Sequence, residues 1–283
     1  MKKIKLKNGA EMPKLGQGTW FMGDEPASRE DEISAIRRGI ELGMTLIDTA
    51  EMYGSGRSEL LVGEAIAPFS REELFVVSKV LPGNAGRGKI FASCEKTLSR
   101  LKTEYLDCYL LHWMGGVPLS ETVECMMELT HRGLIKSFGV SNLDAMDMEE
   151  LYSVADGNKC VTDQVLYHLG SRGVEFDLMP WLAENRTAMM AYCPLAQGAS
   201  LSSGLLRSEA LRVITREKEA DVFQILLAFA LRNDNVAAIP KASSVSHVER
   251  NFKALSIKLT KRDIDILSKD FPPPKRKQPL DMQ

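Results

Sequence analysis

The regular spacing of short apolar runs along the chain is the feature that most restricts the fold. Eight such runs end near residues 18, 48, 79, 112, 141, 164, 192 and 240. Most neighbouring ends lie about 30 residues apart, which is the length of one strand plus one helix in an α/β protein. Segments with helical periodicity follow the runs, as at 28–43 and 90–101. The last interval is longer and has room for an extra loop or helix.

This spacing predicts one α/β domain over residues 1–283, a single (β/α)8 TIM barrel, rather than two domains of conventional size. The competing fold is a doubly wound sheet, which usually carries three glycines at its first strand-to-helix turn. The corresponding turn at 16–21 reads GQGTWF and lacks the third glycine. Asn8-Gly9 separates two short strand-like runs and predicts an N-terminal β-hairpin. Residues 271–283, with three consecutive prolines, are expected to form a C-terminal tail.

Composition and charge exclude several classes of protein. Lys plus Arg (36) nearly cancels Asp plus Glu (38), so no global field favours nucleic acid or acidic lipid. Five cysteines without a CxxC pair argue against a disulfide framework or a structural zinc site. Residues 1–12 lack the apolar core of a secretory signal, and the longest apolar run, 222–231, predicts a buried helix rather than a membrane span. We therefore expect a cytoplasmic monomer without nucleic-acid or membrane partners.

Polar residues stand at the carboxyl ends of several predicted strands, and these ends open into one shared mouth in a (β/α)8 barrel. The residues concerned are Asp48, Lys79, His112, Ser141, Asn142 and Gln164. Any one of them alone would more often be structural than catalytic. Their recurrence at successive strand ends predicts a functional site at that mouth.

Sequence motifs then connect these positions to a known family. Residues 43–54 read GMTLIDTAEMYG, and 58–63 read SELLVG, which resembles the first signature of the aldo-keto reductases. Four further segments resemble later motifs of that family and follow the same order. They are LDCYLLHW at 106–113, GLIKSFGVSN at 133–142, AYCPL at 191–195 and IPKASS at 239–244. The chain is most similar to bacterial members that reduce methylglyoxal and related 2-oxoaldehydes. The resemblance implies a barrel that reduces small aldehydes to alcohols with NADPH.

The resemblance implies a catalytic tetrad of Asp48, Tyr53, Lys79 and His112. Carbonyl reduction needs a hydride from the nicotinamide and a proton from an acid near the developing alkoxide, and Tyr53 is the expected acid. A free tyrosine holds its proton too tightly at neutral pH, so we expect Lys79 to lower the pKa of Tyr53. Asp48 is expected to pair with Lys79, and His112 to orient the substrate oxygen as a neutral imidazole.

The resemblance also implies a set of NADPH contacts, drawn from several strand ends and the segments that follow them. These are Gly18, Thr19, Trp20, Asp48, Ser141, Asn142, Gln164, Tyr192, Cys193, Pro194, Leu195, Gln197, Lys241, Ala242, Ser243, Ser244, Arg250 and Asn251. Ser141, Asn142 and Gln164 would clamp the carboxamide, and Tyr192 would stack on the nicotinamide ring. Gly18 would let the backbone approach the ribose closely.

At the adenosine end, the chain departs from the family pattern. The family has an arginine six residues after the lysine and a glutamate at nine, whereas this chain has His247 and Arg250 at these places, with Asn251 following. Lys241 offers a cation for a 2′-phosphate, and Arg250 can replace the missing guanidinium. A guanidinium group binds phosphate through two parallel hydrogen bonds, which an imidazole cannot form. We therefore expect NADPH to be preferred, with NADH also possible.

The substrate pocket is expected to comprise Trp20, Tyr53, His112 and Trp113. Phe21, Met52 and Met114 lie beside these motifs and would extend an apolar wall suited to small carbonyl compounds with little charge. No metal site is expected, because the histidines outside the tetrad lack ligand partners at suitable spacing.

Two functions from other classes compete with this interpretation. Some barrels of the family serve as cofactor-binding partners of membrane proteins, but the intact tetrad argues against a purely regulatory role. An aldolase-type barrel would use Lys79 as a Schiff-base nucleophile. The neighbouring Asp48 should instead keep that amine protonated and unreactive.

Overall fold

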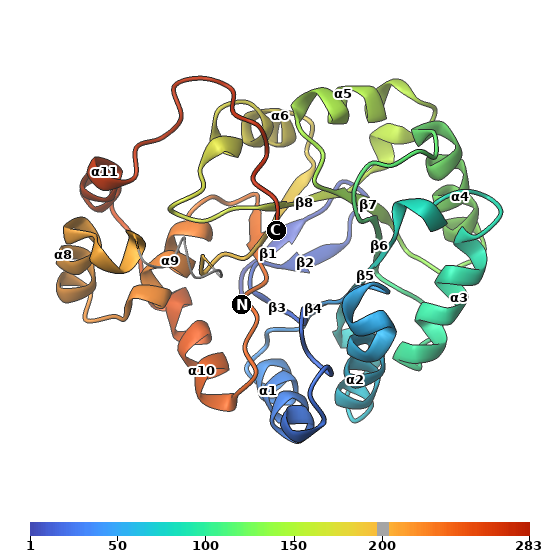
Figure 1. Ribbon diagram of the computed structural model, residues 1–283, viewed down its shortest axis with the longest axis horizontal. Coiled ribbons are helices and arrows are strands. Elements are labelled where there is room, and N and C mark those ends of the chain that lie inside the picture. Colours follow the sequence, from blue (N-terminus) through green and yellow to red (C-terminus); the bar gives the residue numbers. More distant parts are fainter. Residues whose placement is uncertain (197–203) are drawn as a thin grey trace.

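The computed structural model describes residues 1–196 and 204–283, and a parallel eight-stranded sheet forms its centre (Figure 1). The strands neighbour one another in chain order: β3 (Gly16–Gly18), β4 (Leu46–Asp48), β5 (Phe75–Val80), β6 (Cys108–Leu111), β7 (Phe138–Ser141), β8 (Thr162–Leu166), β9 (Ala188–Tyr192) and β10 (Val236–Ala238). Backbone hydrogen bonds from Ala238 to Lys14 (2.8 Å) and from Gly18 to Pro240 (3.2 Å) join the two edges of the sheet. The predicted (β/α)8 barrel is confirmed.

Helices surround the sheet, and their buried faces are apolar as the sequence periodicity predicts. The helices are α1 (Arg29–Glu41), α2 (Arg57–Ile66), α3 (Ile90–Leu101), α4 (Leu119–His131), α5 (Ala145–Ser153), α6 (Leu178–Glu184), α8 (Glu209–Glu217), α9 (Val222–Ala230), α10 (Val245–Lys253) and α11 (Lys261–Asp270). Both α8 and α9 lie between β9 and β10, which accounts for the long last interval in the sequence. The apolar run at 222–231 corresponds to α9, which is buried on all but its first turn.

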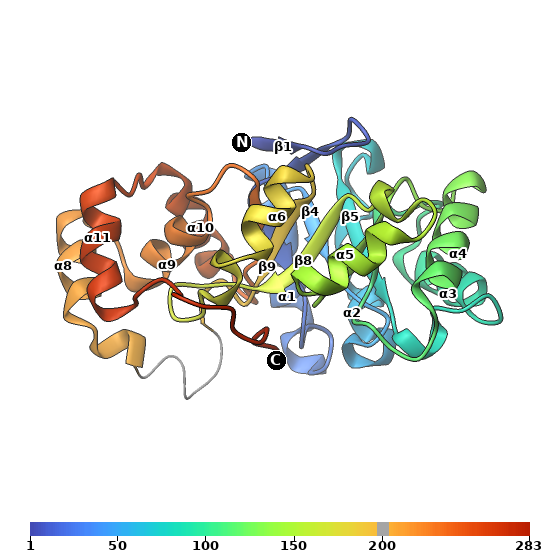
Figure 2. The same cartoon turned by 90° about the horizontal axis from the view of Figure 1, so that it is seen from above.

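The predicted hairpin consists of β1 (Lys3–Lys5) and β2 (Glu11–Pro13). Its side chains Ile4, Leu6 and Met12 are buried in one cluster with residues inside the barrel, such as Leu46 and Val77. The hairpin therefore closes the amino-terminal end of the barrel and leaves the opposite end for a site. Figure 2 shows the hairpin and the chain's C-terminus at opposite faces.

Asp163, on β8, is a charged residue type in an unusual environment. Its side chain is fully buried, and neither carboxyl oxygen has a hydrogen-bond partner among the described residues. Burial raises the pKa of Asp163 well above its usual range. The carboxylates of Asp147 and Asp144 add to that increase. Asp163 is therefore held as the neutral acid.

A consequence is that Asp163→Asn should stabilise the protein increasingly as the pH rises. The raised pKa means that wild-type stability is fully present below the unfolded pKa, about 4, and declines as pH rises towards the folded value. The amide does not titrate, so the variant's advantage should grow between pH 5 and 7 by up to about 1.4 kcal/mol per pH unit. Urea unfolding at both pH values measures it. The exposed Asp31→Asn is the matched control, and an advantage independent of pH would refute the neutral-acid assignment.

Candidate active site

Lys79 lies near the carboxyl end of β5, and its side chain is completely buried. Its Nζ donates to Asp48 Oδ2 (2.8 Å), to the carbonyl oxygen of Thr49 (2.9 Å) and to the hydroxyl oxygen of Tyr53 (3.1 Å). An ammonium group has three donors, so each proton has an acceptor. The geometry thus joins three members of the predicted tetrad directly.

Asp48 ends β4 and is 2% exposed. Its second oxygen, Oδ1, accepts a hydrogen bond from Gln164 Nε2 at 2.7 Å. Burial raises the pKa of Asp48 and lowers that of Lys79, while the salt bridge between them opposes both changes. A buried ion pair persists when its remaining hydrogen-bonding groups are also satisfied, which is the case here.

Tyr53 follows β4 in a short 3-10 turn (Tyr53–Gly56). Its ring covers the Lys79 ammonium, with 4.7 Å between Nζ and the ring centroid. We expected Lys79 to lower the pKa of Tyr53, but the structure indicates the opposite net effect. Burial raises the pKa well above 10, and the negative charge of Asp48 acts in the same direction. The hydroxyl group therefore retains its proton at neutral pH.

His112 follows β6 and is 7% exposed. Its ring meets that of Tyr53 edge-on, with 5.8 Å between centroids, and lies 4.8 Å from that of Trp113. Burial and the charge of Lys79 lower its pKa to about 3, so the imidazole is neutral, as expected. Nδ1 is buried without a hydrogen-bond partner among the described residues.

Tyr53 and His112 line a small cavity of about 60 Å³ in the barrel mouth, with Lys79 and Asp48 buried behind Tyr53. Its lining residues are Trp20, Met52, Tyr53, His112, Trp113, Ser141, Asn142, Gln164, Tyr192, Met282 and Gln283. All four predicted substrate-pocket residues are among them, whereas Phe21 and Met114 are not. Phe21 is 60% exposed and stacks on Trp20 outside the cavity. Met282 and Gln283 were not among the predicted residues, because the path of the tail depends on tertiary contacts.

The residues predicted to clamp the carboxamide lie close together, and their polar groups form hydrogen bonds with the protein itself. Ser141 Oγ donates to the Gln164 carbonyl (2.8 Å), and Asn142 Nδ2 donates to the His112 carbonyl (3.2 Å). The hydroxyl of Tyr192 donates to Asn142 Oδ1 at 2.9 Å. Because the Gln164 amide contacts Asp48, the clamp and the tetrad form one network.

Two residues expected beneath the ribose also have a structural role. A Cβ atom at Gly18 would lie 2.7 Å from the Ile239 carbonyl oxygen, so the missing side chain permits barrel closure. Thr19 is fully buried, and its hydroxyl donates to the Asp48 carbonyl at 2.9 Å. Only Trp20 of this segment reaches the cavity.

A second cavity, of about 150 Å³, contains the residues predicted for the adenosine end. It is lined by Leu195, Asp221, Phe223, Gln224, Lys241, His247, Arg250 and Asn251. Neither Lys241 nor Arg250 forms an ion pair within the described residues. Asp221 and Gln224 form a capping box at the start of α9 and, with the 46% exposed Phe223, were not predicted. A capping box is detectable in sequence, but its proximity to Lys241 is not.

The remaining predicted contacts are distributed around these two cavities. Cys193 and Pro194 are buried beside Tyr192, and Ala242 and Ser243 follow Lys241. Ser244 caps α10 by accepting from the His247 backbone amide, so its hydroxyl has a helical role. Gln197 lies outside the described residues.

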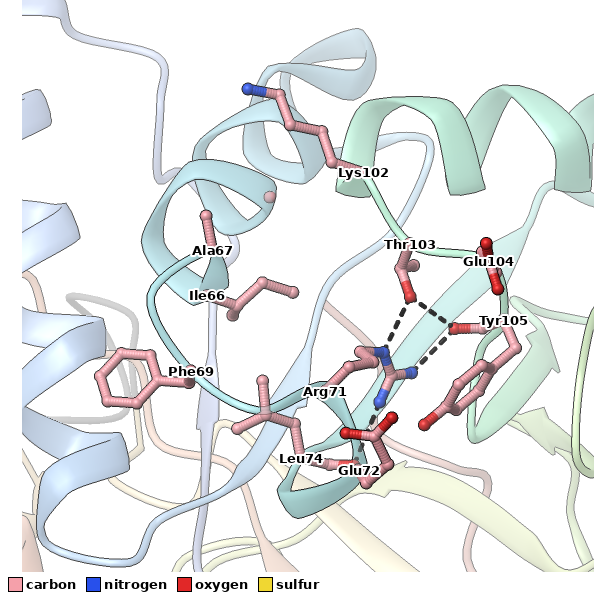
Figure 3. A pocket seen from close by; sticks show the side chains of 11 residues that line it. Ile66, Ala67, Phe69, Arg71, Glu72, Leu74, Lys102, Thr103, Glu104 and Tyr105 are labelled. Carbon is pink, nitrogen blue, oxygen red and sulfur yellow. Dashed lines mark hydrogen bonds between the residues drawn. The ribbon is translucent and has the colours of Figure 1, made fainter.

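A larger cavity of about 300 Å³ lies away from these residues, next to the starts of β5 and β6 (Figure 3). Arg71 is the buried cation in its wall. The Arg71 guanidinium donates hydrogen bonds to Thr103 Oγ1 and to the carbonyl oxygens of Leu74 and Tyr105, and it forms a salt bridge with Asp107. That charge is therefore satisfied. In the part of the chain that the structure describes, no group of three or more His, Cys, Asp or Glu side chains is placed to hold a metal. No helix in these residues combines the length and apolar character needed to cross a membrane.

The neutral state of His112 can be tested directly. With a pKa of about 3, its imidazole should stay neutral from pH 8 down to about pH 4, whereas an ordinary histidine gains its proton near 6.5. Nitrogen-15 NMR of the four histidines, with His112→Gln to assign the signal, measures this. A midpoint near pH 6.5 for the His112 signal would contradict the burial argument.

Comparison with known proteins gives the same picture. Residues 14–269 match the Aldo/keto reductase family. The chain is 47% identical to the methylglyoxal reductase YeaE of Escherichia coli (strain K12), and the match covers 99% of each chain. It is 33% identical to the glyoxal reductase of Bacillus subtilis (strain 168), where the match covers 94% of this chain and 93% of that protein. A crystal structure of an aldo-keto reductase from Klebsiella pneumoniae in complex with NADPH has a TM-score of 0.96 and 47% identity, covering 100% of this chain and 99% of that one. The chain therefore belongs to the aldo/keto reductase family of oxidoreductases.

Proposed function

We propose that this protein reduces small aldehydes and 2-oxoaldehydes, such as methylglyoxal, to alcohols with NADPH. The observation that carries the proposal is the contact of the buried Lys79 ammonium with both Asp48 and the Tyr53 hydroxyl. Similarity over nearly the whole chain to a protein named methylglyoxal reductase supports the substrate class. Similarity to a structure in complex with NADPH supports the cofactor.

In the proposed mechanism, Tyr53 is the general acid. NADPH, when bound, supplies a hydride to the carbonyl carbon. Tyr53 gives its proton to the carbonyl oxygen as negative charge develops there. The raised pKa keeps that proton in place until the substrate is present, and the ammonium of Lys79, 3.1 Å away, stabilises the tyrosinate that remains.

Asp48 and His112 have supporting roles in this proposal. Asp48 holds Lys79 against Tyr53 and neutralises a charge that would otherwise be buried alone. His112 faces the same cavity and stays neutral, so the N–H of its imidazole can donate a hydrogen bond to the substrate oxygen without adding a positive charge to the site. The cavity of about 60 Å³, bounded by Trp20 and Trp113, suits small carbonyl compounds.

Two sets of residues would hold the cofactor, one at the mouth and one at the adenosine cavity. Ser141, Asn142, Gln164 and Tyr192 would hold the nicotinamide end. At the other end, Lys241 and Arg250 would receive the 2′-phosphate, because both line one cavity and neither has an acidic partner among the described residues. These free cations favour NADPH over NADH.

The other two functions fit the geometry less well. Schiff-base chemistry needs a lysine with an available lone pair, but Lys79 donates to three acceptors and is completely buried. A regulatory role would not require the complete Asp48–Lys79–Tyr53 arrangement. We further propose that residues 1–283 act as one unit and as a cytoplasmic monomer, for which five buried free thiols are suitable in a reducing compartment.

An assay of NADPH and NADH oxidation with methylglyoxal, followed at 340 nm, tests this proposal. We expect turnover with a lower KM for NADPH than for NADH. Lys241→Ala should raise the KM for NADPH by about tenfold, the value of one charge-assisted contact to phosphate, and leave that for NADH nearly unchanged.

The matched control is Lys258→Ala, an exposed lysine outside the adenosine cavity. Equal losses for the two cofactors in Lys241→Ala would show that the 2′-phosphate is bound elsewhere. Absence of turnover with methylglyoxal and with a panel of other small aldehydes would overturn the proposed function itself.

A further inference from the structure

His247 lies in the first turn of α10 and lines the adenosine cavity together with Lys241 and Arg250. Its backbone amide donates to the carbonyl oxygen of Ser244, the residue that caps this helix, at 3.1 Å. The residue is exposed, and its imidazole forms no hydrogen bond or ion pair with the part of the chain that the structure describes. The ring is therefore available to a ligand in this cavity.

The charged side chains that line the adenosine cavity are mainly positive. Lys241 and Arg250 face a single carboxylate among the lining residues, that of Asp221. Asp221 Oδ1 accepts a hydrogen bond from the Gln224 backbone amide at 2.9 Å and so caps α9. The cavity thus combines two cations with one carboxylate that is already engaged, and this combination favours an anionic ligand.

The elements packed against α10 are α1, α9 and η7 (Ala254–Ser256), as Figure 1 shows. Arg38 of α1 forms ion pairs with Glu41 (3.1 Å) and with Glu249 of α10 (2.9 Å), so both carboxylates are occupied. Neither α9 nor η7 contains a charged side chain, and Lys253 lies in the last turn of α10. The charges nearest to His247 are therefore those that line the cavity.

An imidazole differs from its neighbours in this cavity because its charge depends on pH near neutrality. Histidine side chains ordinarily ionise between pH 5 and 8, whereas lysine, arginine and aspartate ordinarily keep their charge there. Lys241 and Arg250 repel a third positive charge. A bound phosphate dianion has the opposite effect, because a protonated imidazole can donate a charge-assisted hydrogen bond to it. Phosphate binding and protonation of His247 therefore favour each other.

We propose that His247 takes up a proton when the 2′-phosphate of NADPH binds, and that it thereby strengthens the preference for NADPH over NADH as the pH falls. This inference rests on the proposed function, because that proposal places the 2′-phosphate at Lys241 and Arg250. The proton comes from solvent and stays on the imidazole while NADPH is bound. NADH lacks the 2′-phosphate, so its binding is not coupled to this proton.

The 2′-phosphate also titrates, but with the opposite effect on affinity. The second ionisation of a phosphate monoester lies near pH 6, so NADPH loses negative charge as the pH falls. That change weakens binding to a cluster of cations, and it occurs in every variant alike. Tighter binding of NADPH at pH 6.5 than at pH 8.5 therefore has the sign of histidine protonation and not of phosphate protonation.

Fluorescence titrations of NADPH and NADH at pH 6.5, 7.5 and 8.5 test this inference with wild type, His247→Gln and His247→Arg. The Kd of His247→Gln for NADPH, divided by that of wild type, should rise about three- to fivefold from pH 8.5 to 6.5. His247→Arg keeps its charge, so it should bind NADPH about tenfold more tightly than wild type at pH 8.5 and lose most of this advantage at pH 6.5. The corresponding ratios for NADH should not change with pH.

Isothermal titration calorimetry in buffers of different ionisation enthalpy measures the coupled proton directly. At pH 7, binding of NADPH to wild type should take up about half a proton more than binding to His247→Gln. Binding of NADH should show no such difference. The matched control is His131→Gln, an exposed histidine in the last turn of α4 that does not line the adenosine cavity, and it should behave as wild type.

The possible failures can be told apart. Equal pH dependence of NADPH affinity and equal proton uptake in wild type and His247→Gln would overturn the role of His247 and leave the proposed function intact. A pH dependence of NADH binding that His247→Gln removes would also overturn it, because the proton would then not be coupled to the 2′-phosphate. Failure of wild type to bind NADPH at any of these pH values would overturn the proposed function as well.

Discussion

The structure of the site depends on the buried contact between the Lys79 ammonium and the Asp48 carboxylate. Both groups are removed from water at the carboxyl ends of neighbouring strands, and each would be costly to bury alone. The barrel offsets the loss of hydration with further hydrogen bonds. Thr49 and Tyr53 accept from the ammonium, and Gln164 donates to the carboxylate. Tyr53 is thereby held as part of an ionic network rather than as a packed aromatic residue.

The exclusion of water that raises the free energy of burying this ion pair also determines the protonation states of Tyr53 and His112. Burial keeps Tyr53 as the phenol and His112 as the neutral imidazole, so one physical cause prepares both groups for the roles proposed here. Our expectation that Lys79 would lower the pKa of Tyr53 considered the nearby charge without the burial. In the folded protein, the ammonium is neutralised by Asp48, and loss of water has the larger effect on Tyr53.

Local periodicity is sufficient to predict the barrel, and polar residues at strand ends are sufficient to predict a site at its mouth. Tyr53 does not end a strand, and its place in the tetrad comes from the resemblance to the family. Contacts between distant segments are not encoded in this way. Gly18 permits barrel closure because Ile239 lies opposite. The Gln164 amide reaches Asp48 across the barrel, although β8 and β4 are four positions apart in the order of strands. The position of Gln283 beside Cys193 likewise depends on contacts that Lys277 and Asp281 make far from their place in the chain.

The central claim is that Tyr53, held by Lys79, is the proton donor, and single-turnover kinetics of Tyr53→Phe test it most directly. With NADPH bound beforehand and methylglyoxal then added, hydride transfer should slow by at least about 100-fold, the usual contribution of a general acid. The Kd for NADPH should stay nearly unchanged, and Tyr105→Phe, at the opposite end of the barrel, should behave as wild type. Undiminished hydride transfer in Tyr53→Phe would contradict the account.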